Sequence, residues 1–233
     1  MLHLRHIFLS HPLYTFKKKW RNATMTKRIY AHIIRYLFLI LFIFLMMSQK
    51  FQVWLLVYLI GVVLSFFFGR IYCGYVCPMN TLMRPIQHVS QKIGLQRKKH
   101  PAWLEHSRMP FLILIISITS MIMGKRLFNK NIPILLILFI LSLVVTLFFK
   151  SPVWHNGLCP YSILLRIGGK ISRRSKNVHQ DECIGCTKCM KVCPAGAIFM
   201  NEKTHKAEIQ PSLCHQCELC SDVCPTHTIS YTS

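Results

Sequence analysis

The sequence predicts an α-helical membrane protein with four transmembrane helices, followed by a small cysteine-rich module at the C-terminus. Its 233 residues are 52% hydrophobic and only 15% charged, whereas soluble domains carry about 25% charged residues. The charge is unbalanced, with 29 Lys and Arg against 7 Asp and Glu. Eight of the eleven cysteines lie in the last 56 residues. This composition excludes a disordered chain and argues against an ordinary soluble globule.

Four apolar segments approach the length of about 20 residues that a helix needs to cross a bilayer. They are residues 29–47, 53–69, 108–126 and 132–149. In Ile132–Phe149, fifteen of 18 residues are Leu, Ile, Phe or Val, which favours insertion by about 6 kcal/mol. Pro110–Gly124 is the weakest segment and has to borrow flanking residues. Because Arg35 lies in the first half of its span, we expect its guanidinium to reach toward the lipid headgroups.

The positive charge brackets the apolar segments. The N-terminal tail and the 70–109 loop each carry seven Lys or Arg, whereas the connectors 48–52 and 125–131 carry one and three. The positive-inside rule then places both termini and the C-terminal module in the cytoplasm, with the spans in the inner membrane. Residues 178–233 carry four Lys against six Asp or Glu, which argues against nucleic-acid binding. The predicted divisions are a basic tail, a four-helix membrane domain, a basic linker and the module, at residues 1–28, 29–165, 166–177 and 178–233.

The last eight cysteines form a repeated run. Each run reads Cys-x2-Cys-x2-Cys-x3-Cys-Pro, and the second follows the first after 31 residues. Disulfides are rare in the cytoplasm, so metal binding is the better interpretation. In runs of this spacing, three thiolates of one run and the fourth of the other hold each [4Fe–4S] cluster. The predicted ligands are Cys183, Cys186, Cys189 and Cys224 for cluster 1, and Cys214, Cys217, Cys220 and Cys193 for cluster 2.

The C-terminal module holds few large apolar side chains. Its core alone is marginal, so cluster binding is expected to supply much of its folding free energy. The region resembles the bacterial two-[4Fe–4S] ferredoxin module. This resemblance implies an α+β unit of two short hairpins and two helical turns, related by a pseudo-twofold axis. It also implies that the module relays single electrons.

Three further cysteines follow predicted spans. The second span ends in GRIYCGYVCP, which holds Cys73 and Cys77, and the fourth is followed by WHNGLCP, which holds Cys159 and has His155 in place of the first cysteine. Together with the module, this arrangement resembles the NapH-type membrane iron–sulfur proteins, whose relatives include the membrane domains of NosR/NirI-type and RdxA/CcoG-type proteins. The resemblance covers residues 29–233. It implies a quinol dehydrogenase-like oxidoreductase component that exchanges electrons with the quinone pool and with a partner redox protein.

Three interpretations of Cys73, Cys77, His155 and Cys159 stay open from the sequence. The four residues ligate a third metal centre, for which Cys and His are both suitable. Alternatively, the thiols form a redox-active pair near a quinone headgroup. In the third interpretation the cysteines are structural and His155 caps a span. Iron content separates these interpretations, because two cubane clusters contain about eight irons and three contain about twelve.

We therefore expect a membrane-anchored electron-transfer protein that connects the quinone pool to another redox protein through two [4Fe–4S] clusters. The alternatives are a redox maturation or assembly factor for a metalloenzyme, and an iron–sulfur redox sensor. The sequence shows no P-loop, dinucleotide-binding glycine motif or nucleophile-elbow serine. An ATPase, an NAD-dependent enzyme or a hydrolase is therefore unsupported.

Overall fold

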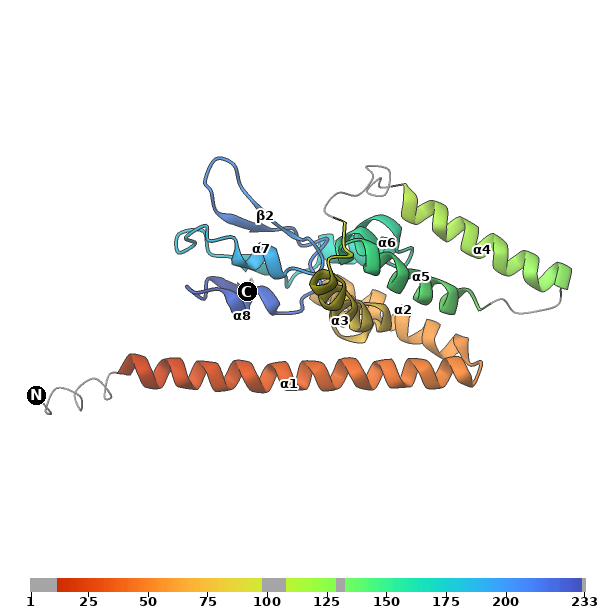
Figure 1. The fold of residues 1–233 in the computed structure, drawn as a ribbon, viewed down its shortest axis with the longest axis horizontal. Coiled ribbons are helices and arrows are strands. Elements are labelled where there is room, and N and C mark those ends of the chain that lie inside the picture. The colour runs from red at the N-terminus through yellow and green to blue at the C-terminus, as the bar shows by residue number, and fades with distance from the viewer. Residues whose placement is uncertain (1–11, 98–107, 129–132, 232–233) are drawn as a thin grey trace, which may run out of the picture.

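The computed structural model describes residues 12–97, 108–128 and 133–231 (Figure 1). Four helices carry the apolar segments, and we call them together the membrane domain: α1 (Pro12–Met47), α2 (Phe51–Phe68), α4 (Met109–Phe128) and α5 (Ile134–Phe148). In Figure 1, α1 runs beneath the rest of the molecule, with the module (blue) above its N-terminal half and α2 above its C-terminal half. Most of the predicted basic tail belongs to α1, which begins at Pro12. The first eleven residues of that tail lie outside the described residues.

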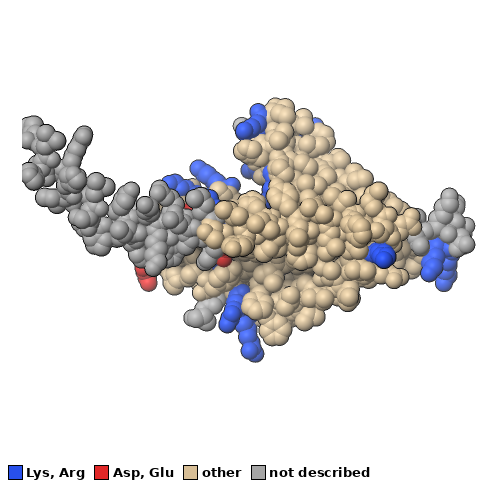
Figure 2. Space-filling model, turned by 90° about the horizontal axis from the view of Figure 1, so that it is seen from below, with Lys and Arg blue, Asp and Glu red and all other residues tan. Residues whose placement is uncertain are grey.

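Long apolar helices confirm a membrane protein. Among the described residues, three helices are long and apolar enough to cross a membrane: Arg28–Met47, Phe51–Phe68 and Met109–Arg126, with mean hydropathies of 2.2, 2.3 and 1.4. Their apolar side chains face outward, and Leu37, Ile40 and Phe44 are 62%, 67% and 63% exposed. Soluble monomers rarely expose such contiguous apolar surface. Figure 2 shows a face that is largely free of charged side chains, with Lys and Arg near its margins.

The fourth predicted span forms a shorter helix than expected. The sequence predicts residues 132–149, of which residue 132 lies outside the described residues, whereas α5 has 15 residues. At 1.5 Å per residue its length is about 22 Å, and the backbone becomes extended at Phe149. By contrast, the segment predicted to be weakest forms the 20-residue helix α4. Apolar composition ranks the insertion free energy of a segment, but it does not fix where the helix begins and ends.

Arg35 is buried, so the expectation that it reaches the lipid headgroups is wrong. Its side chain is 4% exposed. Its Nε donates a hydrogen bond to the Gly74 carbonyl at 2.8 Å, and its guanidinium lies 5.1 Å from the centre of the Tyr75 ring. A backbone carbonyl and an aromatic face inside the protein thus replace the headgroups as partners of this charge. The contact fastens α1 to the segment that follows α2.

Each membrane-side cysteine motif folds into a π-helical turn after a helix of the membrane domain. These turns are η2 (Tyr72–Val76) and η4 (Val153–Leu158), and each leads into an amphipathic helix, α3 (Pro78–Ile93) or α6 (Ser162–Ile171). The packing is reciprocal, since α6 packs along α2 and α3 packs along α5. In Figure 1, α3 is seen nearly end-on, whereas α1 runs horizontally across the picture. The exchange of helices brings η2 and η4 together at the end of the membrane domain that faces the module.

The module consists of two small sheets and two single-turn helices. Its elements are β1 (Lys176–Val178), α7 (Lys188–Val192), β2 (Ile198–Met200), β3 (Ala207–Ile209), α8 (Leu219–Val223) and β4 (Ile229–Tyr231). The resemblance to ferredoxins implied two hairpins. Among the described residues β2 and β3 form the single hairpin, because the first strand of the module pairs with the last. This pairing closes the two halves of the repeat into one unit around a core of small apolar residues and cysteines.

Candidate metal centres

One hollow of the module is lined by four thiols. It encloses about 330 Å³, including the part open to solvent, and its cysteines are Cys183, Cys186, Cys189 and Cys224. The loop before α7 turns back at Thr187, whose φ of 60° lies in the left-handed region, so that the first three sulfurs line the same hollow. Cys224 follows α8 and completes the set. Four thiols around one hollow are the donor set of a [4Fe–4S] cluster, so these residues fit that group.

A second hollow repeats this construction. It is also about 330 Å³ and is lined by Cys193, Cys214, Cys217 and Cys220. Glu218, with φ of 65°, takes the place of Thr187 in the loop before α8. Across the part of the chain that the structure describes, no group of three or more His, Cys, Asp or Glu side chains is arranged to hold a single metal ion. The four thiols of the second hollow are again the donor set of a [4Fe–4S] cluster, so these residues fit that group as well.

Burial opposes ionisation of the thiols in the second hollow. It raises the pKa of Cys214 to about 11 and that of Cys220 to about 12. At Cys224 partial burial acts in the same direction, but hydrogen bonds with Thr228 and Thr226 outweigh it and lower the pKa. Since iron binds the thiolate, cluster assembly has to displace the protons of the buried thiols.

Cys73, Cys77 and Cys159 come together where η2 and η4 meet. Cys73 and Cys159 are buried, and Cys77 packs against the apolar residues around both. Burial, and then the neighbouring Cys73 thiol, raise the pKa of Cys159 to about 12. Arg70 is fully buried beside them, with Nη2 3.6 Å from the Cys73 sulfur. The site is thus a cluster of three thiols next to a buried cation.

His155, the fourth predicted member of this set, points toward the module. Its ring packs edge-on against the ring of His215, with a centroid distance of 4.6 Å. His215 lies between two cysteines of the second run, and both rings are almost fully buried. Burial, followed by the charge of Arg70, lowers the pKa of His155 to about 3. His215 is not among the site residues predicted from the sequence. The signal that marks it is a departure from the repeat, since the first run has Ile184 at the equivalent place.

A layer of buried polar groups surrounds these residues. Within the described part of the chain, twelve buried side-chain nitrogen or oxygen atoms have no hydrogen-bond partner; they belong to Arg35, Arg70, Asn80, Arg84, Trp154, His155, Arg166, His215 and Gln216. A buried polar group without a partner costs about 1–3 kcal/mol. Four of these residues are arginines, so the layer has the chemistry to receive water or an anionic group.

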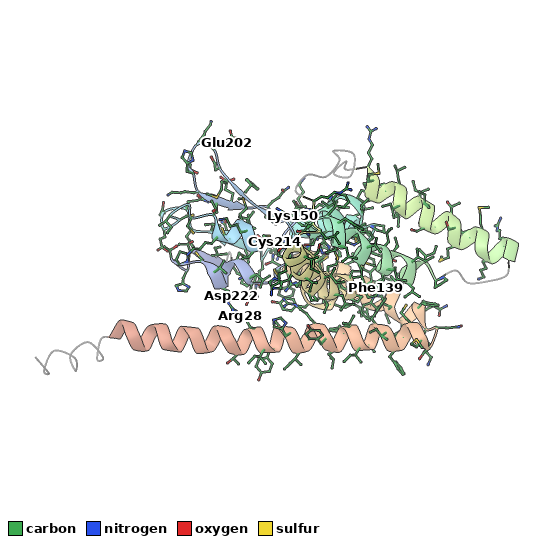
Figure 3. All side chains as sticks on the ribbon, viewed as in Figure 1. Arg28, Phe139, Lys150, Glu202, Cys214 and Asp222 are labelled. Atoms are coloured by element: carbon green, nitrogen blue, oxygen red, sulfur yellow. The ribbon has the colours of Figure 1, made fainter. Side chains whose placement is uncertain are left out.

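The module docks onto the membrane domain through both loops of the second hollow. Arg70 Nη1 donates to the carbonyls of Ser212 and Leu213 at 3.4 Å. Ser151 Oγ donates to the Pro194 carbonyl at 2.9 Å, and Asn156 Nδ2 donates to the Ala195 carbonyl at 2.8 Å. Figure 3 shows Cys214 where the module meets the membrane domain, and Arg28 of α1 beside Asp222 of the module. Arg28 and Asp222 form an ion pair at 2.6 Å.

Two family models match the chain. One, described as a 4Fe-4S binding domain, matches residues 51–96 and 131–179, which contain η2 and η4. The other, described as a 4Fe-4S dicluster domain, matches residues 176–231, which form the module. No solved structure matches the chain significantly.

Several curated proteins are similar over most of the chain. An uncharacterized protein of Methanocaldococcus jannaschii is 27% identical, with 75% of this chain and 69% of that protein covered. The ferredoxin-type protein NapH of Haemophilus influenzae is 23% identical, with 71% and 63% covered. The methylamine utilization ferredoxin-type protein MauN of Methylobacillus flagellatus is 29% identical, with 57% and 52% covered. The chain thus spans between about half and two thirds of the length of these relatives.

Proposed function

We propose that this chain, which belongs to the NapH-type membrane ferredoxin-like proteins, carries single electrons between the quinone pool and a partner redox protein. Its C-terminal region is a 4Fe–4S ferredoxin-like domain joined to apolar helices. The relatives with ferredoxin-type names support iron–sulfur electron transfer as the class of activity of this chain. The observation that carries the proposal is the pair of hollows, each lined by its own four thiols.

We assign the ligands by hollow. One [4Fe–4S] cluster is held by Cys183, Cys186, Cys189 and Cys224, and the other by Cys193, Cys214, Cys217 and Cys220. When bound, each cluster accepts and releases one electron. The cysteines hold it, and the surrounding backbone and threonine hydroxyls set how well it tolerates the added charge.

The three membrane-side thiols form a further redox centre in this proposal. Cys73, Cys77 and Cys159 lie beside Arg70, whose buried charge suits an anionic group. His155 is the residue that the repeat offers as a fourth ligand, although its ring contacts His215. An iron content of about twelve per chain supports a third cluster. A content of about eight leaves these thiols either as a redox-active pair near the quinone headgroup or as structural cysteines.

The proposed topology has four crossings, with both termini and the module in the cytoplasm and the helices in the inner membrane. The N-terminal part of α1 and the C-terminal end of α2 lie at the module (Figure 1). η4, which follows α5, contacts the module as well. After α3 the chain has to cross the membrane away from the module side and cross back before η4. In this proposal α4 and α5 are these two crossings. The domain limits at residues 28, 165 and 177 belong to the same proposal.

The experiment uses the full chain, purified anaerobically and embedded in nanodiscs. We expect brown protein with acid-labile sulfide, and bleaching of the cluster absorbance by a reduced quinol. Bleaching by dithionite alone would overturn the quinone link and favour the maturation factor. Colourless protein without labile sulfide would overturn iron–sulfur electron transfer altogether.

A further inference from the structure

The two hollows of the module occupy equivalent places in the 31-residue repeat, so their linings can be compared position by position. The second hollow has Lys176 where the first has Ala207. The first hollow has Thr228 where the second has Ala197, and its Thr228 hydroxyl lies 3.4 Å from the Cys224 sulfur. Side chains that would set the response to an added electron thus differ between otherwise similar hollows.

Lys176 is a buried cation in the wall of the second hollow. Its side chain is 5% exposed, and its ammonium group donates to Ser221 Oγ at 2.9 Å. The ammonium group also lies 4.4 Å from the centre of the Tyr231 ring. The carboxylate of Glu218, which also lines this hollow, is 3.7 Å away on a side chain that is 31% exposed. Water therefore screens the carboxylate more than the ammonium group, and a net positive field remains inside the hollow.

The field of Lys176 reaches the sulfur ligands. Lys176 lines the same hollow as Cys214, Cys217 and Cys220. Reduction of a cluster in this hollow would add one negative charge to the same group of atoms. A cation that stabilises thiolates there also stabilises the reduced cluster.

The two hollows also face different surroundings. The loops of the second carry His215 and Gln216, which are 1% and 0% exposed beneath the membrane domain. In the loop of the first, Ile184 is 65% exposed and Cys186 is exposed to solvent. The second hollow is therefore the membrane-side end of the module and the first is its outer end.

We infer that Lys176 raises the reduction potential of the cluster in the second hollow, and so makes the membrane-side cluster the preferred resting place of an electron on this chain. The inference rests on the proposed function, because it needs both clusters. It goes further by assigning to one residue the difference in reduction potential between the two clusters.

The test is an anaerobic redox titration of the full chain in nanodiscs, followed by electron paramagnetic resonance. Lys176→Met removes the charge and keeps the length of the side chain. We expect it to lower the reduction potential of one of the two transitions by about 59 mV, which is a tenfold change in the equilibrium constant of a one-electron reduction. Thr228→Val removes the hydroxyl beside Cys224 and is expected to lower the other transition. The control Lys188→Met removes an exposed lysine from the first run and is expected to move neither transition by that much.

Glu218→Gln keeps the test decisive if the methionine variant fails to take up clusters. Loss of the carboxylate leaves Lys176 unopposed, so the transition that Thr228→Val does not lower is expected to rise. The inference is overturned if Lys176→Met and Thr228→Val lower the same transition, or if neither Lys176→Met nor Glu218→Gln shifts one. Two normal transitions with no response leave the proposed function intact, whereas a chain without transitions overturns both proposals.

Discussion

Gly74 is the point at which a single methyl group tests the docking of the module. An added Cβ at this position would overlap the backbone carbonyl oxygen of His215 and lie 3.8 Å from the Cα of Cys217. Backbone atoms of a cysteine-bearing loop cannot swing away as a side chain does, so the loop has to move. Overpacking of this kind costs about 1–3 kcal/mol. We predict that Gly74→Ala increases the fraction of undocked module by about 5-fold to 150-fold.

Hydrogen exchange of the full chain in nanodiscs measures this fraction. Backbone amides of residues 212–217 are expected to exchange faster in Gly74→Ala, and those of the β2–β3 hairpin to remain as in the wild type. Gly94→Ala is the control, because Gly94 follows the end of α3, with φ of 75°, and has open space around it. It is expected to cost local stability at the end of α3 without changing the exchange of residues 212–217. Unchanged exchange in Gly74→Ala, or an equal change in both variants, would refute the docked arrangement.

Three further predictions follow from the same contacts. Removing iron with a chelator is expected to unfold the module and leave the membrane helices intact, which circular dichroism of the full chain and of residues 176–233 measures; a fragment that folds without iron contradicts it. Arg28→Gln is expected to cost at most about 1 kcal/mol in thermal unfolding, because the Arg28 side chain is 53% exposed and water screens its pair with Asp222; a larger loss means that this pair fastens the module. If a third cluster exists, Cys159→Ser lowers the iron content from about twelve to about eight per chain, whereas a content of about eight in both proteins means that these thiols hold no iron.

The identity of the module could be predicted from the sequence because cluster chemistry acts through fixed local spacing. Two runs with the same intervals identify a 4Fe–4S region, and the family model over residues 176–231 confirms it. The distribution of the ligands between the clusters stays a prediction. The pairing of β1 with β4 was not predictable in the same way, since these strands are three residues long and their partners are set by the closure of the whole unit.

The layer between the membrane domain and the module could not be predicted, because its contacts join residues far apart in the chain. Arg70 reads in the sequence as one more basic residue after a span, and its partner Ser212 lies 142 residues away. Arg35 reads as a charge near a membrane surface, yet a carbonyl of η2 takes the place of the headgroups. Charge patterning predicts the side of the membrane on which a residue lies, but it does not reveal a buried acceptor supplied by another element.

Two independent repeats in this chain break their symmetry at one contact. In the membrane domain His155 stands where the first motif has Cys73, and in the module His215 stands where the first run has Ile184. The two replacement rings touch, with centroids 4.6 Å apart. A symmetric module would offer either half to the membrane domain equally well, whereas the paired histidines, together with Arg70, select the second half. The same half carries Lys176 in its hollow. We therefore infer that the departures from both repeats act together: the paired histidines fix which hollow lies at the membrane domain, and Lys176 would set the reduction potential there.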